Sequence, residues 1–142
     1  MLERMTGWLG ILGSNEKKIL REMSVGDAIN AHMKWKAWLQ DYVNGKSDEE
    51  LDPAAICRDD QCLLGRWIHD HAAEHFHRHG AFYTVRTRHA QFHLVAGEVV
   101  TKMRQNNRAA ATELADTHML RASQKLVHAL LELDKQLLAE EA

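Results

Sequence analysis

Long stretches of this chain repeat apolar residues every three or four positions, and a single proline interrupts the 142-residue sequence. Such spacing places the apolar side chains on one face of an α-helix. It predicts three long helices, over residues 14–44, 81–106 and 108–139. No alternating strand pattern accompanies them. The expected fold class is therefore all-α, an antiparallel four-helix bundle whose helices bury their apolar faces against one another.

The stretch between the first two long helices differs in composition. Residues 46–61 contain turn formers, acidic residues and the proline, which is typical of a loop with at most one helical turn. Residues 62–71 then suit a short extra helix that begins at Cys62. We expect this helix to seat against the bundle, since Gly65 permits a close approach and Trp67 supplies a large apolar anchor.

Length and composition limit the possible classes of protein. A chain of this size forms one domain without disulfides, so we expect a bundle over residues 15–142 after an apolar extension over 1–14. The 18 basic and 20 acidic residues form no block of positive charge, which argues against a nucleic-acid partner. The longest apolar stretch, residues 5–12, is too short for a transmembrane helix of about 20 residues. Only two cysteines and no evident signal peptide indicate a cytoplasmic protein.

Histidines are numerous, ten in all, and their placement is informative. His89 and His93 are four residues apart and project from the same helix face, as two ligands of one metal require. His32 lies inside the apolar stripe of the first helix, and Cys62 opens the short helix. Taken singly, each is more often a core residue than a ligand. Taken together, they provide three imidazoles and a thiolate, the donors of a closed tetrahedral zinc site.

Three motifs carry a family resemblance. AHMKW (31–35), CLLGRW (62–67) and HAQFH (89–93) resemble, in order and spacing, the motifs of the chemoreceptor zinc-binding (CZB) domain family, over residues 25–138. The resemblance implies a dimeric four-helix bundle that binds Zn²⁺ through four ligands: His32, Cys62, His89 and His93. Family members are attached to bacterial chemoreceptors or diguanylate cyclases. They regulate these partners through zinc occupancy, or through oxidation of the zinc-bound cysteine by hypochlorous acid.

This sequence departs from that pattern because it shows neither a receptor signalling hairpin nor a cyclase. The resemblance therefore implies a stand-alone sensory domain that acts in trans on a chemoreceptor or a diguanylate cyclase, in chemotaxis or in cyclic-di-GMP signalling. Apolar residues beside the main stripe of the first helix, Ile29 and Trp38, also favour a homodimer. The apolar extension over 1–14 either docks on a partner, a sister subunit or a membrane surface, or packs on its own bundle.

Two other functions compete with this interpretation. A hemerythrin-like di-iron bundle that binds oxygen also uses histidines four apart, but it needs carboxylate ligands that face inward. His128 and Glu132 have suitable spacing, yet they lie largely outside the apolar stripe of their helix, and we expect them at the surface. A zinc hydrolase needs an open coordination position, which four protein ligands do not leave. The sequence thus favours a sensor over an enzyme.

Two further features keep alternatives open. The histidine run from His69 to His79 either holds a second, looser metal or is a solvated, irregular connection, and the second is the simpler expectation. Cys57 is either a bystander thiol or a partner that forms a disulfide with an oxidised Cys62. Because Cys57 lies in an acidic, proline-containing loop without an anchor, we expect Cys62 to be the metal ligand.

Overall fold

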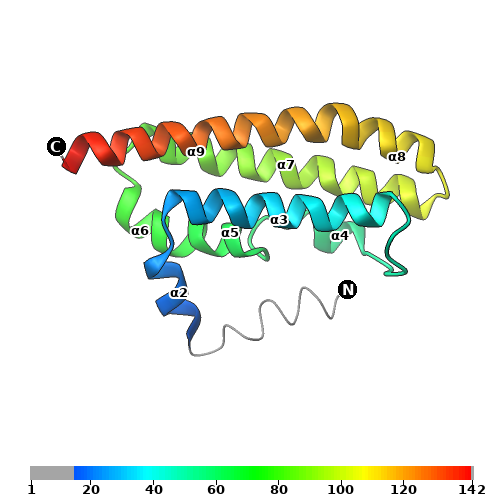
Figure 1. Ribbon diagram of the computed structural model, residues 1–142, viewed down its shortest axis with the longest axis horizontal. Helices are drawn as coiled ribbons and strands as arrows, with labels where there is room; N and C mark the ends of the chain where they lie inside the picture. Colours follow the sequence, from blue (N-terminus) through cyan, green and yellow to red (C-terminus); the bar gives the residue numbers. More distant parts are fainter. Residues whose placement is uncertain (1–14, 142) are drawn as a thin grey trace.

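The computed structural model describes residues 15–141, and every regular element in that range is helical (Figure 1). In chain order the elements are α2 (Glu16–Glu22), α3 (Val25–Val43), α4 (Pro53–Ile56), α5 (Leu63–Arg66), the π-helical segment η2 (Trp67–Ala72), α6 (Ala73–Phe76), α7 (Gly80–Arg104), α8 (Arg108–Leu114), the π-helical segment η3 (Ala115–Met119) and α9 (Leu120–Glu141). No helix among these is long and apolar enough to cross a membrane. The predicted extension over 1–14 lies outside the described residues.

Successive layers of the bundle run in opposite directions (Figure 1). The helix α3 runs one way, the segment from α4 to α6 returns along it, α7 runs forward again, and α8, η3 and α9 return in line. The most extensive contact joins α7 to α9, and α3 packs on α5, α7, α8 and α9. The predicted all-α antiparallel bundle is confirmed, with the short extra helix over α5 and its continuation forming the fourth layer.

The first helix differs from the prediction. A single helix over 14–44 is wrong, because the chain leaves the helical conformation at Met23 and Ser24 and begins again as α3. Ser24 has φ −84° and ψ 171°, and its hydroxyl accepts a hydrogen bond from the Asp27 amide at 3.0 Å. The Asp27 carboxylate accepts in turn from the Ser24 amide at 2.9 Å. This reciprocal capping box separates α2 from the bundle helix.

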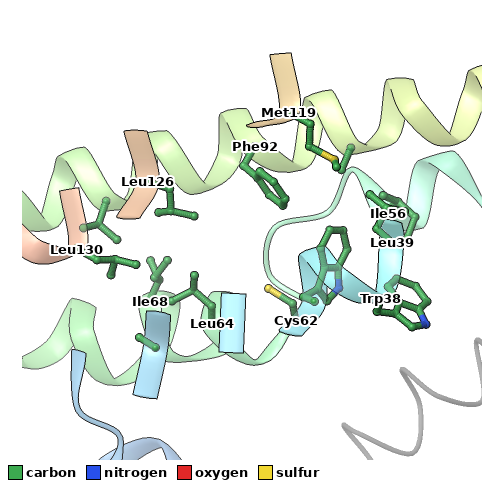
Figure 2. Packing of buried hydrophobic residues seen from close by; sticks show 14 of the residues in the cluster. Trp38, Leu39, Ile56, Cys62, Leu64, Ile68, Phe92, Met119, Leu126 and Leu130 are labelled. Carbon is green, nitrogen blue, oxygen red and sulfur yellow. The ribbon is translucent and has the colours of Figure 1, made fainter. Parts of the chain in front are cut away.

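The predicted apolar stripes form the core. The stripe predicted for the first helix is buried throughout, at Val25, Ala28, His32, Trp35, Leu39 and Tyr42. The stripe predicted for α7 is buried at Phe82, Val85, His89, Phe92, Ala96 and Val99. Figure 2 shows side chains of the short helix, Leu64 and Ile68, directed toward Leu126 and Leu130 of α9. Trp38, which we expected as a surplus residue at a subunit contact, is instead buried in the core of its own chain.

The short helix is longer than predicted. Helical structure continues through α5, η2 and α6, from Leu63 to Phe76, rather than ending near residue 71. The wider turn of η2 keeps Trp67, Ile68 and Ala72 all in the core. The histidines from His69 to His75 therefore lie on a helix, so the irregular connection predicted for this stretch is wrong; only residues 77–79 form a turn.

Gly65 permits the close approach on which the short helix depends. A Cβ added at this position would lie 1.7 Å from the carbonyl oxygen of Asp59, in the loop that precedes Cys62. No side chain fits at that distance, because the neighbouring atom belongs to the backbone. The backbone of the loop is thus in close contact with the first turn of the helix, next to Cys62.

We expect Gly65→Ala to lower the free energy of unfolding by about 1–3 kcal/mol, since the Asp59 backbone must move to admit a methyl group. Gly80→Ala is the matched control. It changes another helical glycine where an added Cβ meets nothing within 4 Å, and it should be neutral or stabilising by up to about 1 kcal/mol. Urea unfolding in a chelating buffer measures both. Equal losses in the two variants would contradict the close approach at Gly65.

Candidate metal centre

Cys62 occupies the N-cap position of α5, at the end of the loop that follows α4. Its Sγ accepts a hydrogen bond from the Gly65 amide at 3.3 Å. The side chain is buried and lies in the interior of the bundle, on the side of α5 that faces Phe92 of α7 (Figure 2). The helix start therefore fixes the sulfur at one position inside the core.

His89 and His93 lie on successive turns of α7 and direct their Nε2 atoms to that sulfur. The distances from Cys62 Sγ are 3.4 Å to His89 Nε2 and 3.5 Å to His93 Nε2. Zn–S bonds near 2.3 Å and Zn–N bonds near 2.0–2.1 Å place two ligands of a tetrahedral zinc ion about 3.6 Å apart. Among residues 15–141, these three side chains are the only such group of potential ligands within 4.8 Å of one another. The donors are thus spaced as zinc requires.

The outward-facing nitrogens of the two imidazoles have different surroundings. His93 Nδ1 lies 2.9 Å from the carbonyl oxygen of Ile56, to which it donates, and this contact assigns the lone pair to Nε2. His89 Nδ1 is buried and has no hydrogen-bond partner. Trp35 of α3 packs over the His93 ring, with ring centroids 4.6 Å apart. His93 is therefore held from two sides, whereas His89 is not.

Burial keeps all the candidate ligands uncharged. It raises the pKa of the Cys62 thiol to about 12 and lowers the pKa of His32 to about 4. The pKa of His89 falls well below its ordinary value, and that of His93 is also lowered, again mainly by burial. The neighbouring His93 lowers the pKa of both His32 and His89 further. Neutral imidazoles are ready to bind a metal, whereas the thiol must release its proton when a metal binds.

His32 lies in the same buried layer but makes a different contact. Its ring meets Phe92 edge to face, with centroids 4.6 Å apart. Its Nε2 is 2.8 Å from the hydroxyl of Ser123 on α9. The structure therefore brings Cys62, His89 and His93 together, and places His32 beside them with one nitrogen engaged by Ser123.

Cys57 is anchored, contrary to our expectation of a loose loop thiol. It follows α4 as its C-cap residue, and its Sγ packs on α7 against Gly97, where an added Cβ would lie 2.2 Å from the sulfur. Gly97 is one helical turn beyond His93. Cys57 nevertheless does not belong to the donor group, which contains Cys62 alone of the two cysteines.

The remaining candidate ligands make other contacts. In the histidine run, His69 Nε2 lies 3.2 Å from Asp59 Oδ2, and His79 Nε2 lies 2.9 Å from Glu140 Oε2. Within the described part of the chain, none of these histidines joins two further ligands at metal-binding distance. His128 is exposed, as predicted, and the Glu132 side chain is 44% exposed.

Sequence reasoning missed three groups around the site. The Ile56 carbonyl could not be recognised from the sequence, because every residue has a backbone carbonyl. Ser123 lies beside the apolar stripe of the last helix, where a small hydroxyl among leucines and alanines was the available signal. Asp59 precedes Cys62 by three residues, and its carboxylate lies 3.9 Å from His89 Nδ1.

Comparison with known families agrees with this geometry. Residues 32–100 match the family model of the chemoreceptor zinc-binding domain. The match begins at His32 and ends within α7, so it includes all four predicted ligands. No curated protein and no solved structure matches the chain. Over residues 32–100, the chain is similar to the chemoreceptor zinc-binding domain family.

Proposed function

We propose that this chain is a zinc-binding sensory domain of bacterial signalling, which senses zinc or hypochlorous acid through His32, Cys62, His89 and His93. The observation that carries the proposal is the buried contact of Cys62 Sγ with Nε2 of both α7 histidines, at 3.4 and 3.5 Å. The match of residues 32–100 to the chemoreceptor zinc-binding domain supports zinc as the ion. A soft sulfur with imidazoles also favours zinc over calcium or magnesium, which prefer oxygen ligands.

His32 is the proposed fourth ligand. It is 2% exposed and lies close enough to His93 for that imidazole to lower the pKa of His32, after burial as the main cause. To reach the ion, His32 exchanges its contact with the Ser123 hydroxyl for a bond to the metal. A hydroxyl is a weak competitor for a neutral imidazole, so this exchange is favourable when zinc is present.

The sensing chemistry centres on the Cys62 sulfur. When bound, zinc supplies the positive charge that keeps this sulfur a thiolate in spite of its burial. Hypochlorous acid takes two electrons from the thiolate: a sulfur–oxygen bond forms, the chlorine–oxygen bond breaks, and chloride leaves with its electron pair. The products are a sulfenic acid at Cys62 and chloride. The neutral sulfenic acid is a poorer ligand, so oxidation weakens the hold of the site on the ion.

The proposed ligands tie three layers of the bundle together. His32 belongs to α3, Cys62 begins α5, and the pair His89 and His93 belongs to α7. Loss of one ligand therefore loosens contacts between layers that are far apart in sequence, and a chemoreceptor or diguanylate cyclase bound in trans senses the change. We place the protein in the cytoplasm, where a reducing environment keeps a thiol ligand available.

A four-ligand shell leaves no position for substrate, which is why we propose a sensor rather than a hydrolase. The hemerythrin-like alternative needs several inward carboxylates around two iron ions. In the described part of the chain the buried polar residues are His32, His89, His93 and Ser123, with no carboxylate among them. The donor set therefore favours a single zinc ion.

Purified protein should contain about one zinc per chain, because the four proposed ligands complete one tetrahedral shell. Elemental analysis after dialysis measures the content. Replacing both His89 and His93 by alanine should abolish it, whereas the exposed His128→Ala control should retain it. Iron as the main metal, or undiminished zinc in the double variant, would rule out this site.

Cys62→Ser should bind zinc much more weakly and lose zinc release triggered by hypochlorous acid, since a serine hydroxyl stays protonated near neutral pH. Cys57→Ser should keep both properties, although Cys57 is the less buried thiol. A chromogenic chelator follows zinc release from each variant during titration with the oxidant. Loss of the response in Cys57→Ser and its retention in Cys62→Ser would reverse the assignment.

The protein should be a homodimer, and α9 offers a surface for it. Leu120, Leu131 and Leu138 are 40%, 50% and 58% exposed, and their spacing of eleven and seven residues places them on one helix face. Light scattering should give twice the chain mass, and replacing Leu131 and Leu138 by glutamate should give monomers. A zinc-loaded protein that is strictly monomeric at about 10 µM, well above the dissociation constants of stable dimers, would contradict the proposal.

A further inference from the structure

The surroundings of His89 leave one polar atom unsatisfied. His89 is 1% exposed, and its Nδ1 has no hydrogen-bond partner, whereas Nε2 faces Cys62. A buried N–H without an acceptor costs about 1–3 kcal/mol. Histidines that bind metals almost always donate their second N–H to a carboxylate, a carbonyl or water. His89 therefore lacks an acceptor that a metal ligand normally has.

Asp59 is the nearest charged acceptor. Its Oδ2 lies 3.9 Å from His89 Nδ1, just beyond hydrogen-bond length, and its side chain is 26% exposed. The backbone of Asp59 is fixed where its carbonyl meets Gly65, so the carboxylate stays at the edge of the site.

The same carboxylate oxygen is already engaged by a second histidine. His69 Nε2, on η2, lies 3.2 Å from Asp59 Oδ2, and the His69 side chain is 40% exposed. Oδ2 thus lies between a histidine at the surface and one in the core. His69 holds the carboxylate away from His89, in competition for one oxygen.

We propose that Asp59 is a positioning residue for the zinc ligand His89, and that His69 competes with His89 for the Asp59 carboxylate. This inference rests on the proposed zinc site. Asp59 accepts the Nδ1 proton of His89, which fixes the ring so that the lone pair of Nε2 points to the metal. His69 weakens this support whenever it draws the carboxylate outward.

The two histidines of α7 are then held in different ways. His93 donates to the backbone carbonyl of Ile56, which is present whatever side chain stands at that position. His89 depends on a side chain that a surface residue engages. Because only the contact of His89 with the Asp59 carboxylate depends on a surface residue, we expect changes around His89, rather than around His93, to alter the affinity for zinc.

The experiment compares the zinc affinity of the unaltered protein with those of Asp59→Ala, His69→Ala, the double variant and a control, each in competition with a chromogenic chelator. Asp59→Ala should weaken zinc binding about 10–100-fold, as loss of an outer carboxylate does. His69→Ala should act in the opposite direction and tighten binding, because the carboxylate is then free for His89. In the double variant the benefit of His69→Ala should vanish. A purely structural role for the pair would weaken binding in both single variants.

Asp60→Ala is the matched control. It removes the same charge from the adjacent position, where the carboxylate is bound by Arg58 and Gln61 and is 46% exposed. It should leave zinc affinity within about twofold of the unchanged protein, since ion pairs at the protein surface contribute little. Thermal unfolding in excess chelator checks that Asp59→Ala folds, and Asp59→Asn, which keeps the side-chain volume, serves if it does not.

The outcomes separate this inference from the proposed function. Unchanged affinity in Asp59→Ala, or equal weakening in His69→Ala, overturns the inference and leaves the zinc site intact. Failure of the unaltered protein to take up zinc contradicts the proposed function instead. In that case the contact between Asp59 and His89 is tested by the imidazole ¹⁵N resonances of the chelator-treated protein. Asp59→Asn should change the chemical shift of His89 Nδ1 and leave the chemical shifts of His93 unchanged. A His89 signal that does not move overturns it.

Discussion

Burial of polar side chains in an apolar bundle core is the constraint on which this structure depends. His32, His89 and His93 are each at most 2% exposed, and the Cys62 thiol is buried beside them. Burial of an imidazole without full hydrogen bonding is costly, and here only part of the capacity is met within the chain. In the proposed zinc site a bound cation offsets this cost, because Nε2 of His89, Nε2 of His93 and the Cys62 sulfur each gain a bond to the metal, while His32 exchanges its Ser123 contact for one.

The segment from the last residue of α4 to the start of α5 provides most of the polar groups around the site. Within seven residues it provides the Ile56 carbonyl that orients His93, the Asp59 carboxylate near His89, and the Cys62 sulfur. Two glycines hold it against the helices, because Gly65 admits the Asp59 carbonyl and Gly97 admits the Cys57 sulfur. The loop is thus part of the packed structure.

Features of the fold that depend on local sequence patterns could be predicted, and features that depend on contacts between distant residues could not. The apolar stripes of α3, α7 and α9 repeat at helical spacing, so the bundle was predictable. Cys62 lies on none of these stripes, and its place beside His89 and His93 was expected only from the combined donor set and from the family resemblance. The break at Ser24 was a local signal that we overlooked, since a serine three residues before an acid is a capping box. The π-helical turn of η2 is different in kind. Its residue Trp67 is fully buried in the core, and we found no local sequence pattern that predicts the wider turn.

The same distinction explains why the surroundings of the ligands were harder to predict than the ligands. A ligand is identified by its side-chain chemistry and by its place on a buried face. The group that supports a ligand is recognised only once the distance between the two is known in the folded structure. Ser123 lies 91 positions from His32 in the sequence, and Ile56 contributes a backbone atom rather than a side chain.

The helix α2 contacts the segment that carries Cys62 from outside the bundle. Leu20 of α2 is buried, the helix packs on η2, and Glu16 pairs with Arg66 of α5 at 2.5 Å. Arg66 lies four residues after Cys62, and its amide donates to the Cys62 carbonyl at 2.9 Å. α2 is therefore joined to the helix that Cys62 begins by one charged pair and by the packing of an apolar side chain. Because the capping box at Ser24 separates α2 from α3, these contacts are distinct from the long helix that carries His32.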